Sequence, residues 1–190
     1  MTMKPTELLE ILRVAEQLKC RTRHCDTTSG RRESVAEHSW RLCLMALLLR
    51  DEFPEADMDR VLKMCVIHDL GEAFTGDIPT FLKTGQDEDE EEGVLENWFQ
   101  SFPSPAKEEM LSLLLEMEEM KTREAKIYKA MDKLEALIQH NESDIAGWLP
   151  LEYDLQKKYA WETVEFSAYL KALRQQVYED TLEKIREAEA

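Results

Sequence analysis

The sequence lacks an excess of positive charge: its 190 residues include 24 Lys and Arg against 40 Asp and Glu, which gives a net charge of −16. A field of this sign repels phosphate backbones and anionic membrane surfaces. Nucleic-acid binding over a broad surface is therefore disfavoured. A small anionic substrate stays compatible, because a divalent cation and a few arginines can reverse the potential inside one pocket.

The sequence also lacks a CxxC pair, a long apolar run and a signal peptide. Its four cysteines are Cys20, Cys25, Cys43 and Cys65. No stretch approaches the roughly 18 to 20 apolar residues of a membrane helix. The first residues form an amphipathic pattern without the basic start and apolar block of a secretory signal. We therefore expect a protein of the reducing cytoplasm with no membrane partner.

No segment has the alternating pattern of a strand, whereas nearly every segment has a helical period. No repeat, low-complexity linker or composition break divides the chain. We therefore expect an all-α, single-domain helical bundle over residues 1–190, with about six or more helices. Its site would lie within about 30–140, and its C-terminal helices within about 141–190. Helices are predicted at 5–19, 34–50, 58–74, 105–120, 122–139 and 159–187, a loop at 20–32, and a solvated acidic loop or helix start at 85–93.

Four polar side chains are predicted to face the core. His38 lies on an apolar helix stripe, His68 and Asp69 end the most apolar helix, and Asp132 borders the inner face of a later helix. A lone His such as His38 is more often a hydrogen-bonded core residue, and a lone helical Asp such as Asp132 commonly bonds to an Arg or a helix terminus, whereas the adjacent His68 and Asp69 are more specific. Together, two carboxylates and two imidazoles cannot be buried unpaired, because each uncompensated charge costs several kcal/mol. One divalent metal ion would neutralise them, and the mixed ligand set suits Mn, Co, Fe, Zn or Ni.

This pattern resembles the HD-domain metal-dependent phosphohydrolases, in which a helix His is followed by His-Asp and a later Asp. The stretches SVAEHSWRL and VIHDLGEAFTGDIPT look most like the branch of bacterial 5'-deoxynucleotidases, which hydrolyse deoxynucleoside monophosphates. The resemblance covers about residues 8–140. It implies a helical bundle of HD-domain type, a homodimer, and a metal-dependent phosphomonoesterase that acts on (deoxy)nucleoside 5'-monophosphates.

The resemblance also implies a role for each matching position. The four metal ligands correspond to His38, His68, Asp69 and Asp132. Glu72 and Asp77 match acidic residues that act beside the metal, orienting or activating the water and meeting the substrate. Arg23 is similar in placement to an arginine that orients the phosphate, and Thr80 falls where the branch contacts the nucleotide.

General chemistry supports these roles and leaves alternatives open. If the helix continues past Asp69, Glu72 lies one turn from His68 and would take a proton from the water or orient it. Asp77 would accept a bond from a sugar hydroxyl or assist the leaving oxygen. Asp69 would meet both the metal and the substrate. The alternatives are a surface carboxylate for Glu72 and a turn aspartate for Asp77.

Arg23 would donate paired hydrogen bonds to phosphate oxygens, with Lys83 also in reach and Arg31 and Arg32 as alternatives. The branch commonly carries a Trp at or shortly after the position following this arginine, which helps to select a sugar without a 2'-hydroxyl. This chain has His24 and Cys25 there. Selectivity for deoxyribose is therefore relaxed or served by another side chain such as Trp40, which by its pattern alone is a core residue.

Two other classes of function compete with this prediction. One is an HD-domain hydrolase of another nucleotide, such as a triphosphate, ppGpp or a cyclic nucleotide. The other is a non-catalytic helical module that binds a metal or a nucleotide. The native metal, which includes Mg among the candidates, is not readable from the ligand types, because availability decides which ion fills such a site.

Overall fold

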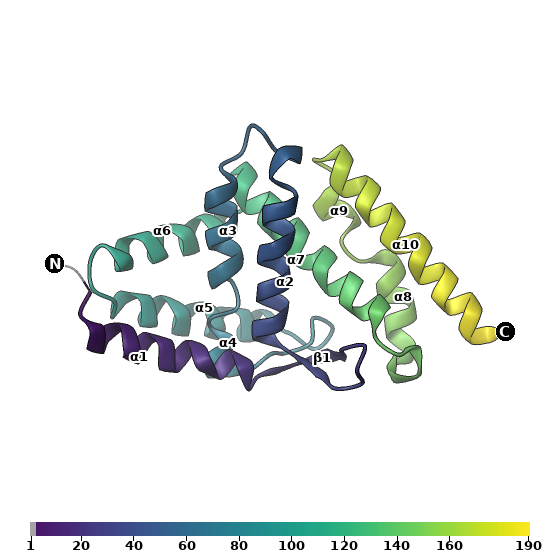
Figure 1. Ribbon diagram of the computed structural model, residues 1–190, viewed down its shortest axis with the longest axis horizontal. Helices are drawn as coiled ribbons and strands as arrows, with labels where there is room; N and C mark the ends of the chain where they lie inside the picture. The colour runs from purple at the N-terminus through teal and green to yellow at the C-terminus, as the bar shows by residue number, and fades with distance from the viewer. Residues whose placement is uncertain (1–2) are drawn as a thin grey trace.

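The computed structural model describes residues 3–190, apart from the side chain of Glu88. It confirms the predicted all-α class and adds one two-stranded hairpin (Figure 1). The elements are α1 (Pro5–Ala15), η1 (Glu16–Lys19), β1 (Thr22–Asp26), β2 (Arg32–Ser34), α2 (Val35–Leu48), η2 (Arg50–Glu52), α3 (Met58–Ile67), α4 (Glu72–Thr75), α5 (Gly85–Gln100), α6 (Ala106–Glu119), α7 (Arg123–Glu142), η3 (Ile145–Gly147), α8 (Pro150–Lys158), α9 (Trp161–Val164) and α10 (Ala168–Glu189).

Helices α2, α3 and α7 form the centre of the molecule and carry much of its core. They pack against one another, with α5 and α6 on one side and α8 to α10 on the other (Figure 1). Leu42, Met64 and Met131, one from each central helix, are fully buried. Burial of each such side chain contributes about 1.5–3 kcal/mol. The three helices therefore form a rigid base for the groups that they carry.

The start of α2 follows directly from its sequence. Ser34 accepts a hydrogen bond from the backbone N–H of Glu37, and the Glu37 carboxylate accepts one from the backbone N–H of Ser34 at 2.9 Å. This reciprocal capping satisfies two donors that a helix start leaves unpaired. The cap fixes where the helix begins, and His38 then lies in its first turn.

The predicted loop at 20–32 is wrong, because its residues contribute to an antiparallel hairpin. Thr22 pairs with Ser34 and Asp26 with Arg32. Gly30 closes the turn with a φ of +79°, which favours glycine. The strands are polar because their side chains meet buried polar groups of the site, so they show none of the apolar alternation by which a strand is recognised.

Two predicted helices are each interrupted in the structure. The helix predicted at 58–74 ends at Ile67 and resumes as α4. A Cβ at Gly71 would lie 2.7 Å from the Glu91 side chain, so this turn depends on close contact with α5. The helix predicted at 159–187 is divided into α9 and α10, where Ser167 caps α10. Helix α8 was not predicted.

Some apolar side chains that were expected inside lie on the surface. Trp40 is 66% exposed, which contradicts its assignment to the core. It follows the buried His38 by two positions and so points to the opposite side of α2. The predicted apolar face of α1 is only partly covered, since Leu8, Leu9 and Leu12 are about half exposed. Within residues 3–190, no helix combines the length and apolar character needed to cross a membrane.

Candidate metal centre and adjoining cavity

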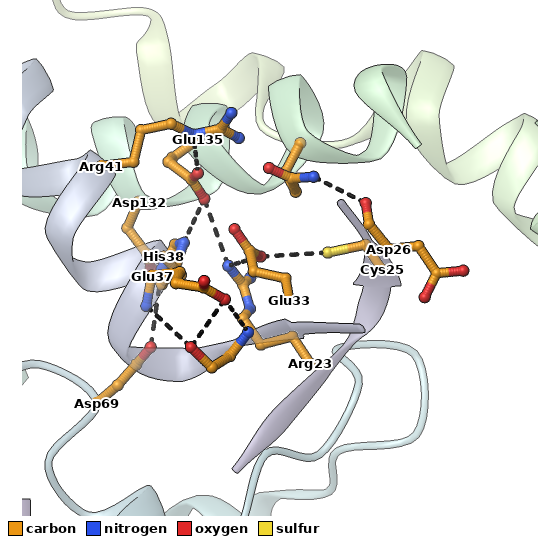
Figure 2. A network of polar contacts seen from close by, with 12 residues as sticks. Arg23, Cys25, Asp26, Glu33, Glu37, His38, Arg41, Asp69, Asp132 and Glu135 are labelled. Atoms are coloured by element: carbon orange, nitrogen blue, oxygen red, sulfur yellow. Dashed lines mark hydrogen bonds and ion pairs between the residues drawn. The ribbon is translucent and has the colours of Figure 1, made fainter. Parts of the chain in front are cut away.

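Three helices deliver four potential metal ligands to one point. His38 comes from α2, His68 and Asp69 from the end of α3, and Asp132 from the middle of α7; Figure 2 shows three of these side chains. In a continuous helix, neighbouring residues point about 100° apart. His68 caps α3 and keeps a helical backbone, and the N–H of Leu70 then bonds to the Ile67 carbonyl at 3.1 Å in a tighter turn. At this transition His68 and Asp69 both approach His38 Nε2.

The ligand atoms of these four residues lie close to one another. His38 Nε2 is 3.2 Å from both His68 Nε2 and Asp132 Oδ1. His68 Nε2 is 3.0 Å from Asp69 Oδ2. The distances from His38 Nε2 to Asp69 Oδ2 and from His68 Nε2 to Asp132 Oδ1 are both 3.7 Å. With metal–ligand bonds of about 2.1 Å, neighbouring ligand atoms lie roughly 3.0–3.4 Å apart, so the spacing suits one ion.

The two imidazoles direct their other nitrogens away from the centre. His68 Nδ1 donates to the carbonyl of Cys65 at 3.0 Å, and His38 Nδ1 donates to the Glu135 carboxylate. When the rings are neutral, both Nε2 atoms carry lone pairs and face two carboxylate oxygens. Lone pairs at this distance repel unless a proton or a cation lies between them. The residues present therefore fit a divalent metal ion.

The ionisation of the surrounding groups agrees with this fit. Burial opposes ionisation of Asp69 and Asp132, but positive charge on a protonated His68 lowers the pKa of Asp69, and Lys129 lowers that of Asp132, both below the usual range. A bound cation would take the place of the His68 proton. Lys129 Nζ bonds to Asp132 Oδ2 at 3.0 Å, which leaves Oδ1 facing the centre. Both aspartates thus present charged oxygens to a cation.

Glu72 lies beside the centre at the start of α4 and is only 5% exposed. Its Oε2 is buried and has no hydrogen-bond partner among the described residues. One of its carboxylate oxygens also lies within 4.8 Å of oxygens of Asp69 and Glu91. Burial, together with Asp69 and Asp77, raises the pKa of Glu72. The predicted continuous helix is absent here, but the turn after Asp69 still brings Glu72 to the site.

A cavity of about 120 Å³ is lined by Arg23, Asp77 and Thr80 but by none of the four potential ligands. Arg23 connects it to the centre through Glu135, which contacts both Arg23 and His38. The remaining wall of the cavity includes side chains of β1, α7 and α8. His24 lies in this wall, with Nε2 3.1 Å from Glu152 Oε1 and its ring edge against Phe81. Burial raises the pKa of Asp77. The structure thus gathers a guanidinium, a carboxyl group and a hydroxyl at one opening.

Lys83 is at a different opening of the same centre. Its Nζ lies 2.6 Å from Glu91 Oε2, and both residues line a second hollow together with His68, Asp69 and Lys129. The structure therefore does not bring Lys83 to the Arg23 cavity. Trp40 lies with Lys19 and Glu37 around a separate hollow on the surface.

Two buried acidic residues next to the centre, Glu135 and Glu33, are not predicted from the sequence. Glu135 is fully buried and contacts His38, Arg23 and Arg41, while Glu33 is 3% exposed and lies 3.4 Å from Arg23 Nη1. In Figure 2, dashed lines join Glu135 to Arg41, His38 and Arg23, and join Glu33 to Arg23. The only local signal for Glu135 was its position one helical turn after Asp132. Glu33 lies between the predicted loop and the Ser34 cap, and no local pattern marks it.

The chain is similar to known proteins along most of its length. The model of the "HD domain" family matches residues 15–174. The human protein "5'-deoxynucleotidase HDDC2" is 31% identical over 139 residues, which cover 71% of this chain and 67% of the relative. A "Predicted metal-dependent phosphohydrolase" from Magnetospirillum magnetotacticum MS-1, solved by crystallography, has a TM-score of 0.80 at 27% identity, covering 94% of this chain and 95% of that one.

A more distant structure has the same fold. The cyanophage S-2L HD phosphohydrolase DatZ, solved with dA and one catalytic Zn²⁺ ion, has a TM-score of 0.60 at 20% identity and covers 97% of this chain and 99% of that one. The resemblance to HD-domain metal-dependent phosphohydrolases that the sequence predicts is therefore confirmed. With the family model spanning most of its length, the chain belongs to the HD domain family.

Proposed function

We propose that the protein is a metal-dependent phosphomonoesterase that hydrolyses (deoxy)nucleoside 5'-monophosphates to a nucleoside and phosphate. The observation that carries this proposal is the convergence of two imidazole nitrogens and two carboxylate oxygens, linked through Glu135 to Arg23 in the wall of a cavity. The relatives named 5'-deoxynucleotidase support the choice of substrate class.

In this proposal one divalent ion is held by His38, His68, Asp69 and Asp132. When bound, such an ion activates water as a nucleophile and polarises a phosphoryl oxygen, which is worth several kcal/mol at the transition state. Imidazole and carboxylate ligands accept Mn, Co, Fe, Zn or Ni, and Mg is a further candidate. We infer no preference among them.

The other side chains would bind the substrate and move protons. Glu72, whose buried oxygen lacks a partner among the described residues, would orient the attacking water, and would take its proton where a bound cation offsets the burial that raises the pKa of Glu72. Arg23 binds the phosphate oxygens, while Asp77 meets the sugar or the leaving oxygen, and Thr80 contacts the nucleotide from the same cavity. Lys83 would reach a phosphate oxygen only from its own opening.

His24 bears on the choice of sugar, because it follows Arg23 and lines the cavity. Its ring contacts Glu152 and Phe81, so an imidazole and not an indole follows Arg23 in the wall of the cavity. We infer that deoxyribose selectivity is relaxed. A homodimer and a cytoplasmic location, both expected from the sequence, also belong to this proposal.

The test is a substrate panel with metal-depleted protein that is reloaded with Mn²⁺ or Co²⁺. Phosphate release is measured with deoxynucleoside and ribonucleoside 5'-monophosphates, a triphosphate, ppGpp and a cyclic nucleotide. Preferred hydrolysis of the monophosphates is expected. Preference for another member would assign the site to that nucleotide, and bound metal without turnover of any member would indicate a binding module.

A further inference from the structure

One fully buried carboxylate connects the two halves of the proposed site. Glu135 Oε2 accepts a hydrogen bond from His38 Nδ1 and lies 3.3 Å from Arg23 Nη1. Its other oxygen, Oε1, accepts a hydrogen bond from Arg41 Nε at 2.6 Å. In Figure 2 all three contacts converge on this one side chain. A single residue thus touches both a potential metal ligand and the arginine of the cavity.

We propose that Glu135 is a positioning residue that couples metal binding at His38 to phosphate binding at Arg23. This inference rests on the proposed function. Glu135 itself faces neither the cavity nor the point where the four ligand atoms meet, so it acts through the two residues that do.

At His38, the bond to Glu135 fixes both the tautomer and the ring orientation. With Nδ1 as the donor, Nε2 keeps its lone pair toward His68 and Asp132. A carboxylate behind a ligating imidazole also makes the ring a stronger donor to a metal, and loss of such a partner typically costs 10–100-fold in metal affinity. Metal affinity therefore depends on where the Glu135 carboxylate lies.

At Arg23, two acidic residues hold one end of the guanidinium. Glu135 Oε2 and Glu33 Oε2 lie 3.3 and 3.4 Å from the same atom, Nη1. Among the described residues these are the side-chain partners of Arg23, so Nη2 and Nε stay available to a ligand. The side chain is 15% exposed, which places these donors at the cavity rather than in solvent.

Arg41 restrains the carboxylate from the other side. It bonds to Glu135 through Nε and to Glu142 through Nη1, each at 2.6 Å. Glu142 is half-exposed and touches neither His38 nor Arg23 in the described contacts. Glu142 therefore offers a matched control on the same helix, since the same change there disturbs Arg41 alone.

The experiment shortens each of the three acids by one methylene and keeps its charge: Glu135→Asp, Glu33→Asp and Glu142→Asp. Calorimetry measures the dissociation constant of Mn²⁺ with metal-depleted protein, and then that of inorganic phosphate with Mn²⁺-loaded protein. Glu135→Asp should weaken Mn²⁺ binding about 10–100-fold and phosphate binding about tenfold. Glu33→Asp should change only phosphate binding, and Glu142→Asp neither.

Wild-type affinities in Glu135→Asp, a loss of only one of them, or equal losses in Glu142→Asp would each overturn the coupling. If thermal melting shows that Glu135→Asp does not fold, Glu135→Gln, which keeps the length and removes the charge, must weaken both ligands instead. Neither measurement needs turnover. A failure of the proposed function would appear as normal Mn²⁺ and phosphate binding by the wild type without hydrolysis of any nucleotide.

Discussion

Two regions of this molecule are rich in carboxylates, and they differ in what surrounds each group. At the centre, Asp132 is 16% exposed in its side chain and Glu135 is fully buried, and each is held by a basic partner. In the acidic run that opens α5, Asp89, Glu90 and Glu92 are exposed. A solvated carboxylate costs little to fold, whereas a buried one requires a partner or a cation. Metal binding and catalysis are therefore expected at the buried carboxylates of the centre and not at the solvated carboxylates of α5.

The largest effect should follow the loss of Asp69. Asp69→Ala removes a ligand atom from the centre, so the metal-to-protein ratio should fall to background. Turnover should drop by roughly 10³-fold or more, because the ion supplies several kcal/mol of transition-state stabilisation. Elemental analysis and phosphate release measure the two quantities. Asp89→Ala, in the solvated run, should change neither, and an active Asp69→Ala would contradict the proposed mechanism.

The next largest effect is expected at Glu72, which is buried beside the centre but is not one of the four proposed metal ligands. Glu72→Gln should retain the metal and lower kcat by about 10²–10⁴-fold, the usual contribution of a positioned acid or base. Its melting temperature should stay near that of the wild type, because burial raises the pKa of Glu72 and favours a neutral carboxyl group, which the neutral amide of Gln replaces at equal size. Glu92→Gln is the exposed control from α5. A normal kcat in Glu72→Gln would remove Glu72 from the reaction.

The contrast between these regions also explains what the sequence can predict. The meeting of His38, His68, Asp69 and Asp132 could be anticipated because polar groups on apolar helix faces form a local, periodic pattern. Glu135 could not, because its partners His38 and Arg23 are 97 and 112 residues away. In the sequence it looks like any acid on a helix surface.

In the fold, too, features set by local sequence could be predicted, and features set by contacts between distant residues could not. The helix starts at Ser34 and at Thr122 follow from capping residues and were predicted closely. The hairpin was missed because its strands are polar and are held by tertiary contacts, such as the hydrogen bond from Gln139 Nε2 to the Asp26 carbonyl at 2.8 Å. The interruption after Ile67 depends on how closely α5 packs, which a local pattern does not contain.

A smaller effect is expected at Arg23, the cation that offsets the acidic background at the cavity. Arg23→Ala should raise KM for a monophosphate about 10–100-fold, the value of one to two charge-assisted hydrogen bonds. Metal content should stay within the wild-type range. Arg32→Ala is the matched control, because Arg32 is half-exposed and paired with Asp26 on the same hairpin. An increase in KM in the control alone would transfer the phosphate role to Arg32.

The smallest effect is expected at Glu37, a half-exposed carboxylate with hydrogen-bond partners. The test asks whether it contributes more to thermal stability than the solvated acids of α5 do. Hydrogen bonds from Arg31 and from the Ser34 backbone lower the pKa of Glu37 to about 2. Because the folded pKa is depressed, the stabilisation is complete above the unfolded value near 4.3 and is lost as the pH falls toward about 2. Solvent screening limits it to about 1 kcal/mol, or a few degrees in melting temperature.

Glu37→Gln should therefore melt a few degrees below the wild type near pH 6, and the difference should narrow near pH 3. Glu92→Gln, which changes an exposed acid of α5, should match the wild type at both values. Thermal melts followed by circular dichroism measure all three proteins. A constant difference between wild type and Glu37→Gln would assign the effect to packing of the side chain. A narrowing difference assigns it to the charge that the cap and Arg31 hold at the start of α2, the helix that carries His38.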